Sequence, residues 1–217
     1  MSTYEQLVEA RKSCTKCAGL INPADPSHAH LDGDEIGPWS RWLASRPAKL
    51  ILVGQDWGTA GYFLKYNGRD LTENLTNGRL TEFLAFLGFK VGPADRTDKQ
   101  SRVFATNGFL CLKRGNAKQL SGSVKQEWYR NCSPFLKDTI DAVAAPVVIT
   151  LGVRAYHAVA NAYGLRPEPF REAVERALAL QLGERRRAFA VFHPAARPVS
   201  RSHDKMRDDW LRIRSSL

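Results

Sequence analysis

The sequence contains no run of about 18 or more apolar residues, the length that a membrane-spanning helix requires, so we expect no membrane span. The first residues, Met1 to Gln6, have neither a basic start nor an apolar segment, and we expect no signal peptide. Cysteine is scarce, with four in 217 residues. These absences predict a cytoplasmic protein, nucleoid-associated if bacterial, in a reducing compartment where structural disulfides are disfavoured.

Acidic residues are outnumbered. Twenty-two Asp and Glu face 32 Lys and Arg, which leaves a net charge of +10. Such a charge favours binding to a polyanion such as DNA, although a soluble protein can also be basic without any such partner. The sequence contains no internal repeat, long linker or low-complexity tail, and its length suits one domain over residues 1–217. We expect a monomer.

Short apolar segments alternate with helical patterns along the chain. We predict strands at 49–53, 102–106, 147–151 and 187–192. We predict helices at about 3–11, 80–87, 124–143, 153–163 and 205–217, the first opened by a capping box of Ser2 and Glu5. This alternation predicts a three-layer α/β/α fold of the α/β class with a central, mostly parallel, four-stranded sheet.

Three polar residues follow predicted strands. Asp56 follows the first strand, Asn107 the second and His193 the last. Because ligands bind at the carboxyl ends of the strands in an open α/β sheet, we expect these side chains to converge on one cleft. Each residue also has a purely structural explanation. Asp56 could cap the following helix, Asn107 could be an ordinary turn residue, and His193 could be a histidine at a strand end whose hydrogen bonds are satisfied within the fold.

The four cysteines favour a shared metal site. Cys14 and Cys17 form a C-x-x-C pair, and Cys111 and Cys132 complete a set of four thiolates. Four thiolates suit one zinc ion or one four-iron cluster, and the spacing alone does not distinguish them. A thioredoxin-like redox pair normally opens a helix directly after a strand, whereas this pair follows a predicted helix. Four unrelated buried thiols are the other alternative.

Several motifs, in order, resemble those of the uracil-DNA glycosylase superfamily, especially its iron–sulfur-containing family four branch. They are Cys14-x-x-Cys17, Thr106-Asn107 followed by Cys111, Asn131-Cys132-Ser133-Pro134-Phe135-Leu136, the strand Val147 to Gly152, and His193-Pro194-Ala195-Ala196, with Trp210 in a similar closing helix. The resemblance implies a [4Fe-4S] cluster with four ligands, Cys14, Cys17, Cys111 and Cys132, that serves structure more than chemistry.

The first motif departs from that branch. Gly54-Gln55-Asp56-Trp57-Gly58 is more similar to the G-Q-D-P-Y motif of the family one enzymes, with Trp57 in place of proline. The family four segment that supplies a stacking phenylalanine is absent, and Tyr62, Phe63 and Tyr66 are candidates for that role. This divergence leaves the base specificity open.

The resemblance assigns roles to the predicted cleft. Asp56 would orient the attacking water and stabilise positive charge on the sugar, and His193 would donate to the uracil oxygen on which charge grows. Asn107 would read the uracil edge because its amide both accepts and donates. Substrate contacts are also expected from Gln55, Trp57 and Tyr66.

DNA contacts are predicted beside this cleft. The basic segment after His193 includes Arg197 and Arg201, and Arg197 or Val199 would fill the space left by the flipped base. Lys113 is expected to meet a phosphate near the second motif.

The sequence as a whole predicts an enzyme that hydrolyses the N-glycosidic bond of uracil in DNA and so initiates base-excision repair. The alternatives are a glycosylase for hypoxanthine or xanthine, an enzyme that traps its product covalently, and a non-catalytic protein that binds uracil-containing DNA.

Overall fold

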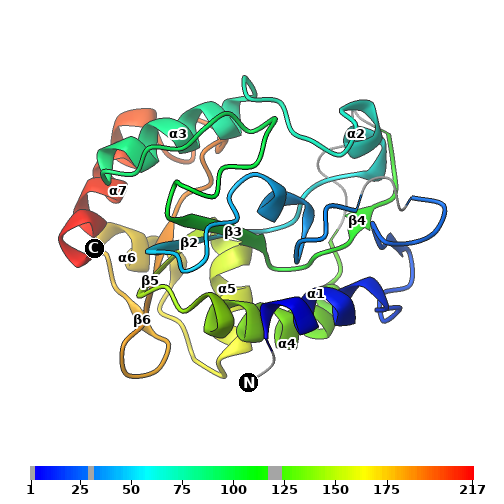
Figure 1. Ribbon diagram of the computed structural model, residues 1–217. Helices are drawn as coiled ribbons and strands as arrows, with labels where there is room; N and C mark the ends of the chain where they lie inside the picture. Colours follow the sequence, from blue (N-terminus) through cyan, green and yellow to red (C-terminus); the bar gives the residue numbers. More distant parts are fainter. Residues whose placement is uncertain (1–2, 29–31, 117–123) are drawn as a thin grey trace.

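The centre of the protein is a five-stranded sheet in the order β3-β2-β5-β7-β6, seen in a computed structural model that describes residues 3–28, 32–116 and 124–217 (Figure 1). Four of its strands run parallel to their neighbours, and β6 pairs antiparallel with β7. The strands are β2 (Leu50–Gly54), β3 (Val103–Asn107), β5 (Val147–Leu151), β6 (Leu180–Gln181) and β7 (Arg187–Val191).

Helices cover both faces of this sheet. The helices are α1 (Tyr4–Lys12), α2 (Ala60–Lys65), α3 (Leu75–Phe86), α4 (Gln126–Val143), α5 (Val153–Ala162), α6 (Phe170–Glu175) and α7 (His203–Ile213). Short 3-10 helices lie at Pro38–Arg41 (η2) and Arg214–Ser216 (η3). In Figure 1, α3 and α7 lie above the sheet, and α1, α4 and α5 lie below it.

The two faces bury separate clusters of apolar side chains. Along β2, Leu50 and Leu52 pack in the cluster shared with α3 and α7, whereas Ile51 and Val53 pack in the one shared with α1, α4 and α5. Side chains alternate between faces along a strand, so a strand covered on both sides is apolar throughout. The expected α/β class and mostly parallel sheet between helices are confirmed.

Several details differ from the predictions. Helices α2 and α6 were not predicted, and α3 begins at Leu75 instead of about residue 80. The sheet has a fifth strand, because the chain before β7 folds back as the two-residue strand β6, which is too short to give a periodic signal. Helix α1 begins one residue later than predicted. Thr3, rather than Ser2, is its N-cap, and the side chains of Thr3 and Gln6 each accept a hydrogen bond from the other's backbone N–H. Ser2 lies outside the described residues.

A second small sheet joins two distant segments. Strand β1 (Leu20–Ile21) pairs antiparallel with β4 (Leu112–Lys113), and it follows the C-x-x-C segment directly. The N-terminal segment is thereby held against the chain that leaves β3. Among the described helices, none is long and apolar enough to cross a membrane.

Candidate active site

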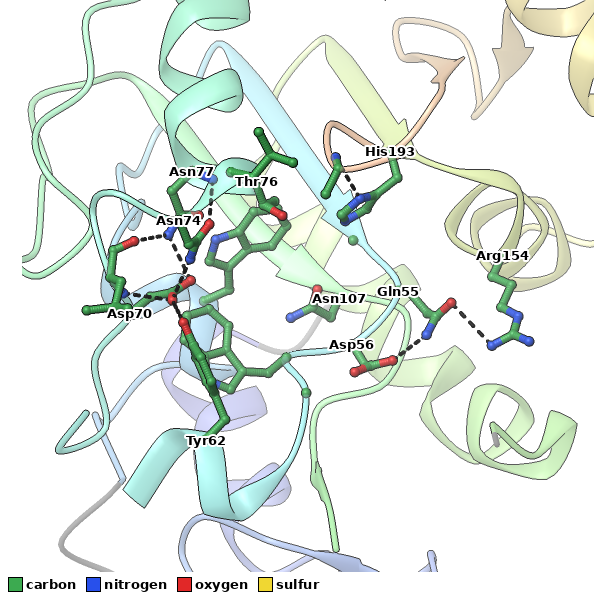
Figure 2. A pocket seen from close by; sticks show the side chains of 17 residues that line it. Gln55, Asp56, Tyr62, Asp70, Asn74, Thr76, Asn77, Asn107, Arg154 and His193 are labelled. Atoms are coloured by element: carbon green, nitrogen blue, oxygen red, sulfur yellow. Dashed lines mark hydrogen bonds between the residues drawn. The ribbon is translucent and has the colours of Figure 1, made fainter. Parts of the chain in front are cut away.

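A cleft of about 660 Å³ opens at the carboxyl edge of the sheet (Figure 2). Asp56, Asn107 and His193 all line it, as expected from their positions at or just after the ends of β2, β3 and β7. The parallel register explains the convergence: Gly54, the last residue of β2, lies beside Asn107, the last residue of β3. Three segments far apart in the sequence therefore deliver a carboxylate, an amide and an imidazole to one space.

Asp56 is held from both of its carboxylate oxygens. Lys113 Nζ lies 3.0 Å from Oδ1, with both side chains only 5% exposed. Gln55 Nε2 donates to Oδ2, and Arg154 Nη1 in turn donates to Gln55 Oε1 at 3.3 Å. The carboxylate is thus fixed in orientation, and the nearby Lys113 ammonium balances its charge in a largely buried place.

Asn107 presents an unused acceptor. The residue is 3% exposed, and its Oδ1 has no hydrogen-bond partner within the described residues. A Cβ atom on Gly54 would stand 2.5 Å from this oxygen, so only glycine lets the end of β2 come this close to the amide. A buried polar atom without a partner is unfavourable unless a ligand supplies one. An N–H donor in the cleft would satisfy Asn107.

His193 is arranged to donate from Nε2. Its Nδ1 accepts a hydrogen bond from the Ala195 backbone N–H at 3.1 Å. Burial lowers the pKa of His193 below its ordinary value, although the charge of Asp56 acts in the opposite direction. The imidazole is therefore neutral at neutral pH, and with Nδ1 occupied as an acceptor its single proton resides on Nε2.

Aromatic and amide side chains form the opposite wall. Trp39, Trp57 and Tyr62 line the cleft, and Trp57 packs edge-to-face on Phe63 with ring centroids 5.6 Å apart. Tyr66 is not part of the lining. It packs against Tyr62 with ring centroids 4.9 Å apart, and Tyr62, one turn earlier, lines the cleft in its place.

Asp70 fixes this wall. Its carboxylate accepts hydrogen bonds from the Tyr62 hydroxyl and from the side-chain amides of Asn74 and Asn77 (Figure 2). This network escaped the sequence analysis, because Asn and Asp residues in a segment without periodicity are typical of any loop. Arg154 was also missed, although it follows Gly152 at the end of β5 and so shares the carboxyl edge that was used to find the other residues.

The chain matches the uracil DNA glycosylase superfamily over residues 43–214. It belongs to that superfamily. No curated protein matches the chain. Membership suggests DNA glycosylase activity on damaged bases and implies that the chain binds DNA, and the matched range includes Asp56, Asn107 and His193.

A DNA glycosylase must also contact the strand, and the predicted DNA contacts fall in different environments. Arg197 is exposed, and Val199 is 92% exposed on the same loop. Arg201 is buried and makes two hydrogen bonds to Asp209, at 2.9 and 2.5 Å, so it stabilises the base of the loop instead of facing DNA. Lys113 is likewise buried, with its ammonium 3.0 Å from Asp56 Oδ1, and does not lie on the outer surface.

Helix α3 contacts both ends of the loop at residues 193–203, between β7 and α7. Arg79 Nη1 donates to the Pro194 carbonyl at 2.6 Å, and Glu82 lies 3.0 Å from Nε2 of His203. The start and end of the loop are therefore fixed, while Val199 projects from its middle.

The cysteines interact without forming a recognisable metal site. The thiols of Cys17 and Cys132 share a hydrogen bond, which lowers the pKa of Cys17 and raises that of Cys132. Burial raises the pKa of Cys111 to about 12, and Cys17 and Cys14 add to this effect. In the part of the chain that the structure describes, no group of three or more His, Cys, Asp or Glu side chains is arranged to hold a metal ion. The expected cluster is not confirmed.

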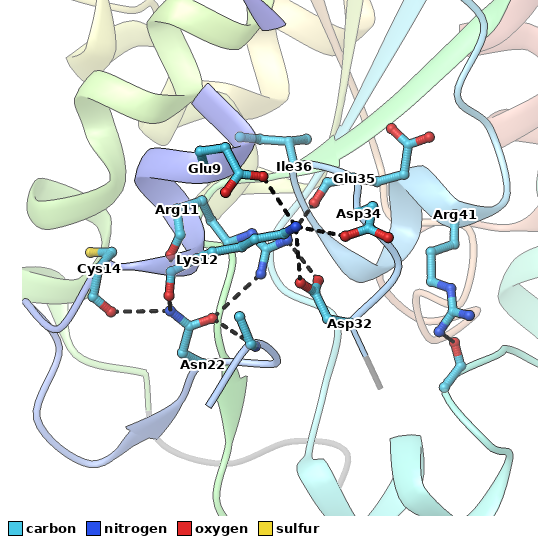
Figure 3. A network of polar contacts seen from close by, with 12 residues as sticks. Glu9, Arg11, Lys12, Cys14, Asn22, Asp32, Asp34, Glu35, Ile36 and Arg41 are labelled. Atoms are coloured by element: carbon cyan, nitrogen blue, oxygen red, sulfur yellow. Dashed lines mark hydrogen bonds and ion pairs between the residues drawn. The ribbon is translucent and has the colours of Figure 1, made fainter. Parts of the chain in front are cut away.

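A polar network fixes the segment that carries Cys14 (Figure 3). The Asn22 side-chain amide donates to the carbonyls of Arg11, Lys12 and Cys14, which closes the end of α1. The buried Arg11 guanidinium donates to Asp32 Oδ1 and to the Glu35 carbonyl, both at 2.7 Å. These contacts hold the C-x-x-C segment in place by means other than the thiols.

Proposed function

We propose that this protein removes uracil from DNA by hydrolysing the N-glycosidic bond, as the first step of base-excision repair. The observation that carries the proposal is the convergence of Asp56, Asn107 and His193 on one cleft of a superfamily member. Because a base inside a duplex is out of reach, the nucleotide would be extruded into this cleft. The cleft volume of about 660 Å³ has room for a base with its sugar.

Cleavage of the bond places positive charge on the sugar and negative charge on the departing base. Asp56, held by Lys113 and Gln55, would orient a water molecule toward the anomeric carbon and stabilise the positive charge there. His193 would donate its Nε2–H to the base oxygen that gains charge, and a neutral donor suffices because the bond strengthens as the oxygen becomes anionic.

Base recognition follows from the unused polar groups. Asn107 Oδ1 would accept the N3–H of uracil, and the side-chain amide would donate to a neighbouring base oxygen. Trp57 and Tyr62 would stack against the base from the opposite wall. On the DNA side, Arg197 would meet the backbone, and Val199 is exposed enough to fill the space left in the duplex.

We also propose that the chain belongs to a divergent part of the iron–sulfur-containing family four branch and that residues 1–217 fold as one domain. Cys14, Cys17, Cys111 and Cys132 would hold a [4Fe-4S] cluster. The contact between the Cys17 and Cys132 thiols, which joins the N-terminal segment to α4, supports two of these four ligands. When bound, the cluster would supply a structural cross-link between the N-terminal segment, the start of β4 and α4. The visible absorption spectrum and the iron and sulfide content of the purified protein test this point separately from activity.

The test of function is a strand-nicking assay. A labelled oligonucleotide with one uracil is incubated with the protein and then treated with alkali. We expect uracil-dependent cleavage that falls about 100-fold or more in Asp56→Asn and in His193→Ala. Asp95→Asn, which removes an exposed carboxylate outside the cleft, should leave the rate unchanged.

Parallel substrates decide between the alternatives. Release of hypoxanthine or xanthine, with uracil left intact, would move the assignment to a glycosylase for deaminated purines. Tight binding of uracil-containing DNA without release of any base would indicate a binding protein.

A further inference from the structure

A second pocket, of about 410 Å³, lies between α4 and α5. Residues 154, 157, 158 and 161 of α5 line it, and they share one face of the helix because the last three follow the first by three, four and seven positions. Helix α4 adds Gln126 and Tyr129, and Val124 also lines the pocket. At about 1.5 Å per residue, the polar side of α5 runs for about 10 Å along the pocket.

Among the described residues, the lining of this pocket offers hydrogen-bond donors and no carboxylate. Arg154 makes its one hydrogen bond within the described residues to Gln55, and it has no acidic partner there. Gln126, His157 and Asn161 are exposed, and their side chains make no hydrogen bond with any other described residue, so they can turn toward a ligand. Such a set of unused donors around a cationic side chain suits an anion.

Tyr129 adds a buried donor. The residue is 7% exposed, and its hydroxyl has no partner within the described residues. Its ring cannot swing away, because it packs edge-to-face on Phe109 and approaches Gly108 so closely that a Cβ there would lie 2.8 Å from it. Burial raises the pKa of Tyr129, the Asp56 charge raises it further and the Arg154 charge opposes this, so the hydroxyl keeps its proton at neutral pH. A buried hydroxyl without a partner lowers stability unless a ligand accepts from it.

The pocket adjoins the candidate active site. Arg154 lines both spaces, since α5 begins directly after β5 at the carboxyl edge of the sheet. We propose that this second pocket binds a backbone phosphate of the DNA strand that carries the damaged base, with Tyr129, Arg154 and His157 as the principal donors. The proposal rests on the proposed function, because it takes DNA as the substrate.

The experiment measures oligonucleotide affinity while one phosphate at a time is replaced by a neutral methylphosphonate. Asp56→Asn serves as the parent so that the base stays attached. Tyr129→Phe is introduced into it, and Thr139→Val is the matched control, because it removes another buried hydroxyl without a described partner from α4, outside the pocket. Arg154→Gln is compared with Arg185→Gln, which removes an exposed charge from the turn between β6 and β7.

We expect Tyr129→Phe to bind the unmodified oligonucleotide about tenfold more weakly than the parent, as for loss of a hydrogen bond to a charged group, and Thr139→Val to bind as the parent does. One methylphosphonate close to the damaged base should weaken the parent by a similar factor and leave Tyr129→Phe unaffected. Arg154→Gln should reduce the salt dependence of binding by about one phosphate contact, and Arg185→Gln should not.

An identical methylphosphonate profile in the parent and in Tyr129→Phe would overturn the proposal. So would binding of inorganic phosphate, seen as a shift of the His157 ring resonances, if oligonucleotide affinity did not depend on Tyr129. Failure of the proposed function is seen elsewhere, as the absence of base release by the protein with Asp56 intact. The phosphate scan still reports on the pocket in that case.

Discussion

Because Lys113 and Asp56 form a buried ion pair, we predict that substitutions of the two residues are strongly coupled in their effect on the free energy of unfolding. At 3.0 Å and an effective dielectric constant of about 20, the attraction between the two charges is about 5 kcal/mol, and the cost of removing both from water offsets part of it. Lys113→Met leaves a carboxylate that is 5% exposed without its ammonium partner. We expect this change to lower the free energy of unfolding by about 3–5 kcal/mol.

The double variant separates this coupling from lost packing. Asp56→Asn removes the charge that Lys113→Met leaves unpaired, so the two changes together should cost less than the sum of their separate costs, by at least about 2 kcal/mol. Urea denaturation of the four proteins measures the cycle. Lys113→Gln, which keeps a hydrogen-bond donor, replaces Lys113→Met if the latter does not fold. Additive costs within about 0.5 kcal/mol would refute the reasoning, because independent sites behave in that way.

Three further predictions concern single residues. Burial lowers the pKa of His193 in the folded protein, so the folded state binds fewer protons than the unfolded state below about pH 6.5. The free energy of unfolding should be at its full value above about pH 6.5 and should decrease as the pH falls through the folded pKa. Urea denaturation between about pH 7.5 and pH 5 should show a flatter pH dependence in His193→Gln. Arg201→Met removes two of the three guanidinium hydrogen bonds to the buried Asp209 carboxylate and leaves only that of Arg212 at 3.0 Å. It should lower the free energy of unfolding by about 2–3 kcal/mol, measured in the same way, and an unchanged stability would contradict the structural role. Gly54→Ala places a Cβ 2.5 Å from Asn107 Oδ1 and should destabilise the protein by about 1–3 kcal/mol while reducing base release more than DNA affinity; equal losses in both would contradict a role for Asn107 in base reading.

Much of the fold follows from local patterns. Strand β5 occupies the residues predicted for it, and β2, β3 and β7 lie within one residue of the predicted ranges, because strands covered on both faces are continuously apolar. The convergence of Asp56, Asn107 and His193 was also predictable. It depends only on the rule that parallel strands end at one edge, and not on side-chain detail.

The burial of two basic residues was not predicted from the sequence. Lys113 and Arg201 were expected on a DNA-facing surface, yet both are buried against carboxylates. A lysine or arginine is exposed by default, and its burial depends on an acidic partner that is distant in the sequence, as Asp56 is from Lys113. The sequence also did not show that Tyr62, and not Tyr66, lines the cleft. Tyr62 and Tyr66 lie one turn apart, and only the direction of α2 decides which of them faces the cleft.

Strand β4 connects the cysteine-bearing segment to the Lys113–Asp56 pair of the candidate active site. Cys111 immediately precedes β4, and Lys113, which pairs with Asp56, ends it. The strand is anchored on one side by β1, whose Leu20 lies opposite Lys113, and on the other by the Gly58 carbonyl, which accepts from the Lys113 backbone N–H at 2.9 Å. Cys111 is therefore two residues along the same strand segment from the side chain that pairs with the candidate catalytic carboxylate. A change in the position of Cys111 would act on Asp56 through Lys113 and would need no contact between the cysteine and the substrate.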